Sequence, residues 1–140
     1  MPDPVDVNFS DLFTLNHLYI PEFQRGYSWT KSQLEDLWID IGQIPEGKHH
    51  YCGSILTVKR DEIRTTLPSP ARIFKLELVD GQQRCTTIFL LLLAIRDRFW
   101  QLNPEHPIGK EIDESFIHFT PHGGSKQLKL KNEHDDLNTF

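Results

Sequence analysis

The hydrophobic pattern along the chain predicts several short strands separated by turns and helices. Residues 17–20 are rich in aromatic and β-branched side chains, which favour a strand, and a proline follows them. Residues 51–59 have an apolar centre, and residues 72–79 begin with apolar and charged side chains alternating on opposite faces. Residues 60–71 are polar and contain two prolines, so an exposed, hairpin-like connection is expected there. An edge strand with outward-pointing lysines is expected at residues 127–131.

Apolar residues at helical spacing predict two helices. The first follows Thr30, which can form a capping box with Gln33. Its apolar stripe predicts that one face packs against a core. The stripe consists of Leu34, Leu37, Trp38 and Ile41. The second helix is expected at residues 86–101. It is apolar all round from residue 88 to residue 95, which predicts a central position in the fold.

Strands and helices in this order predict an α/β (α+β) domain, with a small mixed sheet flanked by helices. A length of 140 residues favours a single domain, residues 1–140, with enough buried surface for a core. The chain stops at Phe140 without a helix stop or turn, so we expect a truncated fragment of a longer protein. The N-terminus lacks an apolar secretory segment, and no apolar run can span a bilayer. A cytoplasmic protein without a membrane partner is therefore expected.

Composition and motif searches exclude several classes of protein. A net charge of −5 excludes a uniformly basic DNA-binding surface, although a local basic groove remains compatible with it. The two cysteines lack CxxC spacing and the seven histidines form no metal-binding motif, so neither a zinc site nor a disulfide scaffold is expected. The chain has no Walker A loop and no GxGxxG fingerprint, so a nucleotide site would have to be of another kind.

The most informative stretch follows the strand predicted at residues 72–79. Its sequence is Asp80-Gly81-Gln82-Gln83-Arg84, and the apolar helix comes directly after it. A strand–turn–helix junction presents backbone N–H groups and the positive end of a helix dipole, which together favour phosphate. The five residues alone fit two interpretations, a nucleotide site or a tight turn ending in a surface arginine.

Other polar residues can complete a nucleotide site at this junction. Gln24 and Arg25 follow the strand at residues 17–20, and two arginines brought together can clamp a polyphosphate bidentately. Asp80 could hold Mg²⁺, which combines one or two carboxylates with phosphate oxygens. Gly53 interrupts its predicted strand, either as a bulge or as a point of close approach by a ligand or another element.

Cys85 directly follows the polar stretch, and the sequence leaves two roles open for it. A thiol at a helix N-terminus beside an arginine can have a lowered pKa and react. Alternatively, the cysteine packs as a small apolar residue in the core, which is the favoured interpretation.

Three segments, in order and at matching spacing, resemble the signatures of the GmrSD-type restriction endonuclease N-terminal domain, which is related to the ParB/sulfiredoxin fold. They read IPEFQRGYSW at residues 20–29, YCGSI at residues 51–55 and VDGQQRCTT at residues 79–87. The resemblance spans about residues 9–100. It implies a domain that binds and hydrolyses a nucleoside triphosphate with Mg²⁺, and so regulates a nuclease in a phage-defence system that restricts modified DNA. The family's nuclease is a separate HNH module, in cis or in trans, and nothing like it is present in these residues.

The resemblance also implies roles for individual residues. Asp80, Gly81, Gln82, Gln83 and Arg84 would form the nucleotide-site motif, with Asp80, Gln83 and Arg84 as its catalytic members. Gln24 and Arg25 match the first ParB-like box, and Gly53 matches the middle one. Tyr27 and Trp29 match the family pattern, with a packing role left open. Cys85 stands where the family commonly has leucine, which supports its burial.

A different function class remains open from the sequence, namely a non-catalytic ParB-like module that recognises DNA. This alternative predicts a basic groove and DNA binding that weakens steeply with salt. The groove would be formed by Lys59, Arg60, Arg64 and Arg72.

Overall fold

The computed structural model describes residues 5–21, 28–49, 52–66 and 70–132 of the chain. The helices are α1 (Phe9–Leu15), α2 (Lys31–Gly42), α3 (Gln82–Leu102), α4 (Pro107–Ile112) and the π-helix η1 (Asp113–Ile117). The strands are β1 (Asn16–Ile20), β2 (Leu56–Arg64), β3 (Arg72–Asp80), β4 (His118–Phe119), β5 (Gln127–Leu128) and β6 (Leu130–Asn132). Helices and strands are interspersed along the chain, and the predicted mixed α/β class is confirmed.

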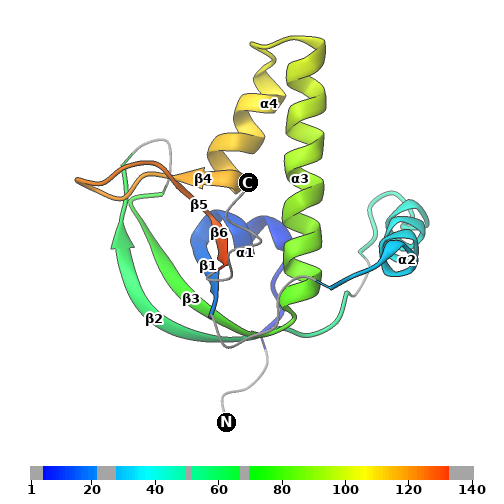
Figure 1. The fold of residues 1–140 in the computed structure, drawn as a ribbon, viewed down its shortest axis with the longest axis horizontal. Helices are drawn as coiled ribbons and strands as arrows, with labels where there is room; N and C mark the ends of the chain where they lie inside the picture. The colour runs from blue at the N-terminus through cyan, green and yellow to red at the C-terminus, as the bar shows by residue number, and fades with distance from the viewer. Residues whose placement is uncertain (1–4, 22–27, 50–51, 67–69, 133–140) are drawn as a thin grey trace.

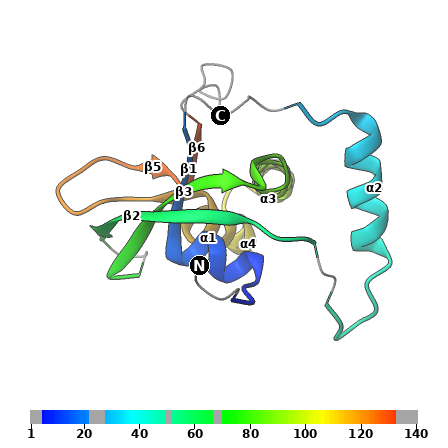
Figure 2. The same cartoon turned by 90° about the horizontal axis from the view of Figure 1, so that it is seen from below.

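The main sheet has the strand order β2-β3-β1-β6. Strands β2 and β3 form a long, curved antiparallel hairpin (Figures 1 and 2), whereas β1 runs parallel to both β3 and β6. Strands β4 and β5 form a separate antiparallel pair. Because β1 and β3 are parallel neighbours, their carboxyl ends, Ile20 and Asp80, lie at the same end of the sheet. The sheet is small and mixed, as predicted.

The core lies where α1, the two central strands and the first half of α3 meet. Phe13 of α1 contacts Phe89 of α3, with ring centroids 6.0 Å apart, and both side chains are fully buried. Leu18 of β1 and Leu78 of β3 are also fully buried in this cluster. Asn8 caps α1 by accepting a hydrogen bond from the Asp11 N–H at 2.7 Å. This packing anchors the strand–helix junction on which the candidate site is built.

Helix α2 departs from the prediction that its apolar stripe faces a core. The predicted capping box of Thr30 and Gln33 is present, so the start of the helix is confirmed. No residue of α2 is buried, however, and Trp38 is 66% exposed. Figures 1 and 2 show the helix to one side of α3 and the sheet, and Leu37 packs against the periphery of the core. Helical spacing creates an apolar face but does not specify what covers it.

The later part of α3 is also less buried than its sequence predicts. The helix begins at Gln82, four residues before the predicted start, and its buried residues lie between Gln83 and Phe89. Beyond that point the side chains are partly buried or exposed, and Ile95 is 39% exposed. Figure 1 shows the second half of α3 beside α4 and away from the sheet, which explains why only its first half is central.

The strand boundaries correct two further predictions. Strand β2 begins at Leu56 and continues to Arg64, so the first part of the predicted connection is paired with β3. Lys129 lies between β5 and β6 and is fully buried, instead of pointing outward. Its Nζ donates a hydrogen bond to the Thr14 carbonyl oxygen at 2.8 Å. The chain changes sheet at this residue, which turns the lysine inward and breaks the alternation on which the prediction relied.

Candidate functional site

The site is built on the junction between β3 and α3, where a single glycine, Gly81, separates the strand from the helix. Gly81 has φ +89°, a left-handed conformation that favours glycine. A Cβ atom at this position would also lie 2.6 Å from Ile55 Cγ2. The backbone conformation and the close contact with Ile55 therefore both require glycine. As the N-cap of α3, Gly81 supplies no capping side chain to the first turn of the helix. The predicted strand–turn–helix junction is therefore present.

Arg84 is held by the segment that precedes β2. Its Nη1 donates a hydrogen bond to the Ser54 carbonyl oxygen at 3.3 Å. Gly53 has φ +104°, and a Cβ atom there would lie 2.8–2.9 Å from the guanidinium atoms of Arg84. Of the two interpretations of Gly53, close approach by another element is correct, and that element is the arginine of the motif.

Gln83 connects the motif to a third segment. Its side chain is 8% exposed, and its Oε1 accepts a hydrogen bond from the Ser28 N–H at 2.7 Å. Ser28 follows the segment that contains Gln24 and Arg25, two predicted ligands that lie outside the described residues. The structure thus brings together residues 28–29, 53–54 and 80–84, which are far apart in the sequence. How Gln24 and Arg25 are placed stays a prediction.

A pocket of about 200 Å³ opens at this meeting point. It is lined by Trp29, Asp80, Gly81, Gln82, Gln83 and Arg84. All five motif residues therefore face one cavity, together with the tryptophan whose role the sequence left open. The cavity combines one aromatic surface, one carboxylate, two amides and one guanidinium group.

The fit of a magnesium ion to this pocket depends on Asp80. Asp80 is exposed, and its Oδ1 accepts a hydrogen bond from the Gly81 N–H at 2.9 Å. Within the described part of the chain, no three histidine, cysteine, aspartate or glutamate side chains gather as a metal site. Mg²⁺ bound to a nucleotide needs only one or two protein carboxylates, because phosphate oxygens and water complete its shell. Asp80 fits that role, but only together with phosphate.

Cys85 is a core residue. It is fully buried, and burial raises the pKa of its thiol to about 12, with the nearby charge of Arg84 opposing the rise. A thiol with this pKa stays protonated near neutral pH and is a poor nucleophile. The favoured interpretation, packing in the core, is confirmed, and a reactive thiolate at this position is excluded.

The predicted basic groove is partly neutralised by ion pairs. On the β2–β3 hairpin, Arg60 pairs with Glu77 at 2.5 Å and Arg72 pairs with Glu62 at 2.8 Å. Two of the four cations proposed to contact DNA thus have a carboxylate partner on the same hairpin. This arrangement weakens the positive potential that non-specific DNA binding requires.

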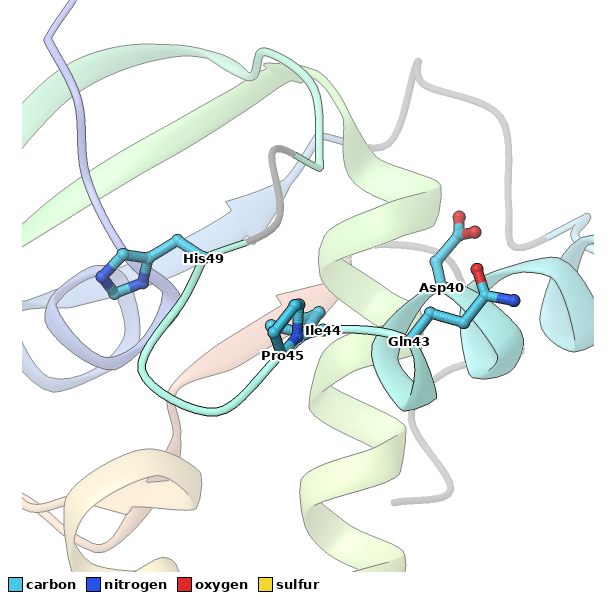
Figure 3. A pocket seen from close by; sticks show the side chains of 5 residues that line it. All are labelled: Asp40, Gln43, Ile44, Pro45 and His49. Carbon is cyan, nitrogen blue, oxygen red and sulfur yellow. The ribbon is translucent and has the colours of Figure 1, made fainter.

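A second pocket of about 200 Å³ lies at the end of α2 (Figure 3). It is lined by Asp40, Gln43, Ile44, Pro45 and His49. Figure 3 shows Asp40 on the helix and Gln43 directly after its end, with Ile44 and Pro45 between them and His49. None of these residues belongs to the three matching segments, so the β3–α3 pocket is the better candidate site.

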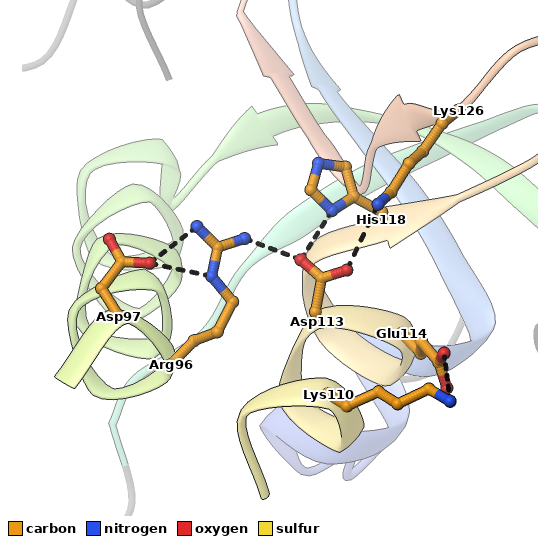
Figure 4. Close-up of polar contacts among 7 residues, drawn as sticks. All are labelled: Arg96, Asp97, Lys110, Asp113, Glu114, His118 and Lys126. Carbon is orange, nitrogen blue, oxygen red and sulfur yellow. Dashed lines mark hydrogen bonds and ion pairs between the residues drawn. The ribbon is translucent and has the colours of Figure 1, made fainter. Parts of the chain in front are cut away.

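The sequence does not predict the network of charged side chains around the buried Asp113 (Figure 4). Asp113 of η1 accepts hydrogen bonds from Arg96 Nη1 at 2.7 Å and from His118 Nδ1 at 2.9 Å, and Lys126 Nζ lies 3.5 Å from its other oxygen. Burial alone would raise the pKa of Asp113, but the Arg96 hydrogen bond and the charges of His118 and Lys126 outweigh it and lower that pKa. The network ties α3 to η1 and β4, so its role is structural. Its members are separated by up to 30 residues in the sequence, and no local pattern reveals it.

Comparison with known proteins identifies one related family. The model described as "GmrSD restriction endonuclease, N-terminal domain" matches residues 9–140, which extends the resemblance to the end of the chain. No curated protein matches the sequence. In the part of the chain that the structure describes, no helix is long and apolar enough to cross a membrane.

Proposed function

Because the chain belongs to the family of GmrSD restriction endonuclease N-terminal domains, and so is part of a restriction system, we propose that it is the nucleotide-dependent regulatory domain of that system. It binds a nucleoside triphosphate with Mg²⁺ at the β3–α3 pocket and hydrolyses it. The nucleotide state then controls an HNH-type nuclease module, in the same chain or in a partner, that cleaves modified DNA. A restriction system of this kind acts in the cytoplasm, where phage DNA is encountered.

One observation carries this proposal, which is the convergence of three separate segments on Arg84 and Gln83. A simple surface turn would not need Gly53 against the Arg84 guanidinium, nor a buried Gln83 bonded to Ser28. A fixed guanidinium beside the N-terminus of a 21-residue helix favours a polyphosphate, because both supply positive potential at the same place.

The chemistry of the site follows from positioning and charge neutralisation, as is usual in phosphoryl transfer. Arg84 neutralises negative charge on the phosphate oxygens. The backbone N–H groups at the start of α3 and the amide of Gln82 donate hydrogen bonds to those oxygens. Asp80 would hold Mg²⁺, which would supply further neutralisation of the phosphate charge. Arg25 supplies a second cation and Gln24 a second amide from the segment before Ser28.

The test is nucleotide binding measured by calorimetry with Arg84→Ala beside the wild-type chain. Loss of a charge-assisted contact of about 1.5–3 kcal/mol predicts roughly 10-fold to 150-fold weaker binding. Arg98→Ala is the matched control, because Arg98 is an exposed arginine on the same helix whose Nη1 bonds Gln101 at 3.4 Å. Equal affinity in wild type and Arg84→Ala would contradict the proposal.

A further inference from the structure

We infer that Trp29 is the surface on which the nucleobase stacks, and that Gln83 is the positioning residue that holds Trp29 at the pocket. This inference rests on the proposed function, because it concerns the base of the same nucleotide. Trp29 is the one aromatic side chain among the six residues that line the pocket, and its indole is partly exposed there. The other five lining residues offer charge, amides and backbone, which suit phosphate and not a base.

Hydrogen bonds on both sides fix the backbone of Trp29. Before it, the Ser28 N–H donates to Gln83 Oε1 at 2.7 Å. After it, the Thr30 N–H donates to Gln33 Oε1 at 2.6 Å in the capping box that starts α2. The tryptophan therefore connects two anchored positions, one on the motif and one on α2. An aromatic side chain held in this way is preorganised, and little conformational entropy is lost when a ligand stacks on it.

The geometry separates the roles of the two ends of a nucleotide. Arg84 and the start of α3 attract the phosphates, while the indole presents a large apolar face with a π-system. Every base has a π-face, so stacking on such a surface stabilises the base without reading its hydrogen-bonding edge. An inorganic polyphosphate has no base and would use only the phosphate end of the site. This difference between the two ligands provides the test.

Gln83 acts through Trp29 in this scheme. Its side chain is buried and its carbonyl oxygen is engaged by the Ser28 N–H. Loss of that acceptor would release the residue next to Trp29 and leave the Ser28 N–H without this partner. Under this inference Gln83 orients the aromatic wall, which differs from the catalytic role that the family resemblance implies.

The experiment is calorimetry on the 140-residue chain with the four Mg-NTPs and with magnesium tripolyphosphate. For the NTP that wild type binds most tightly, Trp29→Ala is expected to weaken binding about 5-fold to 150-fold, the ratio that corresponds to loss of one stacked base. Binding of tripolyphosphate is expected to stay unchanged. Trp38→Ala is the matched control, because Trp38 is 66% exposed on α2 and does not line the pocket. Trp38→Ala should change neither the affinity for the NTP nor the affinity for tripolyphosphate.

Tryptophan fluorescence gives an independent readout. Adding the NTP should quench the wild-type emission, whereas tripolyphosphate should not. The quench should disappear in Trp29→Phe, which keeps an aromatic ring and part of the affinity. If the NTP still quenches the emission of Trp29→Phe, the inference that the base stacks on Trp29 is wrong.

Two substitutions of Gln83 separate positioning from direct contact with phosphate. Gln83→Glu keeps an acceptor for the Ser28 N–H, whereas Gln83→Leu removes it. Under the inference, Gln83→Leu resembles Trp29→Ala, and Gln83→Glu retains most of the affinity for the NTP. If Gln83 contacts phosphate directly, the new carboxylate in Gln83→Glu abolishes binding of both ligands, which would overturn its positioning role.

The outcomes distinguish this inference from the proposed function. If wild type and Trp29→Ala bind the NTP equally well, the proposed function is not contradicted, but the stacking inference is wrong. An equal loss of NTP and tripolyphosphate affinity in Trp29→Ala, with cooperative thermal unfolding retained, also overturns it, because the residue then shapes the phosphate site. If wild type binds neither an NTP nor tripolyphosphate, both the stacking inference and the proposed function are wrong.

Discussion

Replacing Gly53 with alanine is expected to impair the nucleotide site by displacing Arg84. The new Cβ atom would lie 2.8 Å from Arg84 Nη2, whereas ordinary contact requires about 3.5 Å or more. The guanidinium group must therefore move by roughly 0.7 Å, and it is the far end of a flexible side chain, so it can do so. A misplacement of about 1 Å in a site that works by positioning can cost up to roughly 100-fold in rate. We expect kcat/KM for NTP hydrolysis to fall about 10-fold to 100-fold.

The same substitution strains the backbone, and this effect must be separated from the displacement of Arg84. Alanine at φ +104° costs on the order of 1–3 kcal/mol in the free energy of unfolding. Gly47→Ala is the matched control, because Gly47 has φ +75° and nothing lies within 4 Å of the Cβ position. Both variants should be destabilised in urea unfolding, but only Gly53→Ala should lose hydrolysis.

The comparison has a clear refuting result. If Gly53→Ala and Gly47→Ala hydrolyse NTP at the same rate per folded molecule, the position of Arg84 does not matter to the reaction. The guanidinium would then have no role at the site, and the argument from its fixed position would fail.

Two further predictions concern the buried charges. Asp113→Asn should cost on the order of 1–3 kcal/mol of unfolding free energy at pH 7, since it removes the carboxylate shared by Arg96, His118 and Lys126, although Arg96 keeps its ion pair with Asp97. Because the folded pKa of Asp113 is lowered, its stabilisation is present above the unfolded pKa and is lost as pH falls through the folded one. The gap between wild type and Asp113→Asn in urea titrations should therefore narrow on acidification, and a constant gap would contradict this reasoning. Burial lowers the pKa of Lys129 from 10.5 to about 8 in the folded protein. Between pH 8 and 10.5 the unfolded chain therefore binds more protons at this residue than the folded protein does. Wild type should gain stability relative to Lys129→Met as pH rises from 8 to 10.5, and parallel pH profiles of the two proteins would refute the burial of a titrating amine.

The junction at the centre of the site was predictable because its signals are local. The apolar strand before Asp80, the glycine at position 81 and the apolar helix after Arg84 lie within a short stretch and agree with one another. The contacts that make the junction a site were not predictable in the same way. Gly53 signalled a close approach, but only the fold shows that Arg84 is the group that approaches.

The failures have a common physical cause, which is that local patterns do not specify tertiary partners. The stripe on α2 has core spacing, yet Leu34 is 39% exposed and Trp38 is 66% exposed, and Leu37 packs at the edge of the core. Lys129 fits the alternation of an edge strand, yet the chain changes sheet there and turns the amine toward the Thr14 carbonyl oxygen. The Asp113 network joins α3, η1 and β4, and its residues do not recur at a regular spacing in the sequence.

The two glycines of the site are explained by a single segment. Residues 53–56 lie along the motif, so that Gly53 meets Arg84, Ile55 meets Gly81, and Leu56 pairs with Asp80 in the ladder between β2 and β3. Each contact involves a different motif residue, yet all three come from the first residue of β2 and the short segment directly before it. The orientation of Arg84 is therefore set by the β2–β3 hairpin as well as by α3. Since hairpin and helix must keep their register for the guanidinium to stay in place, a shift of β2 along β3 would move the charge at the pocket without any change in the motif itself.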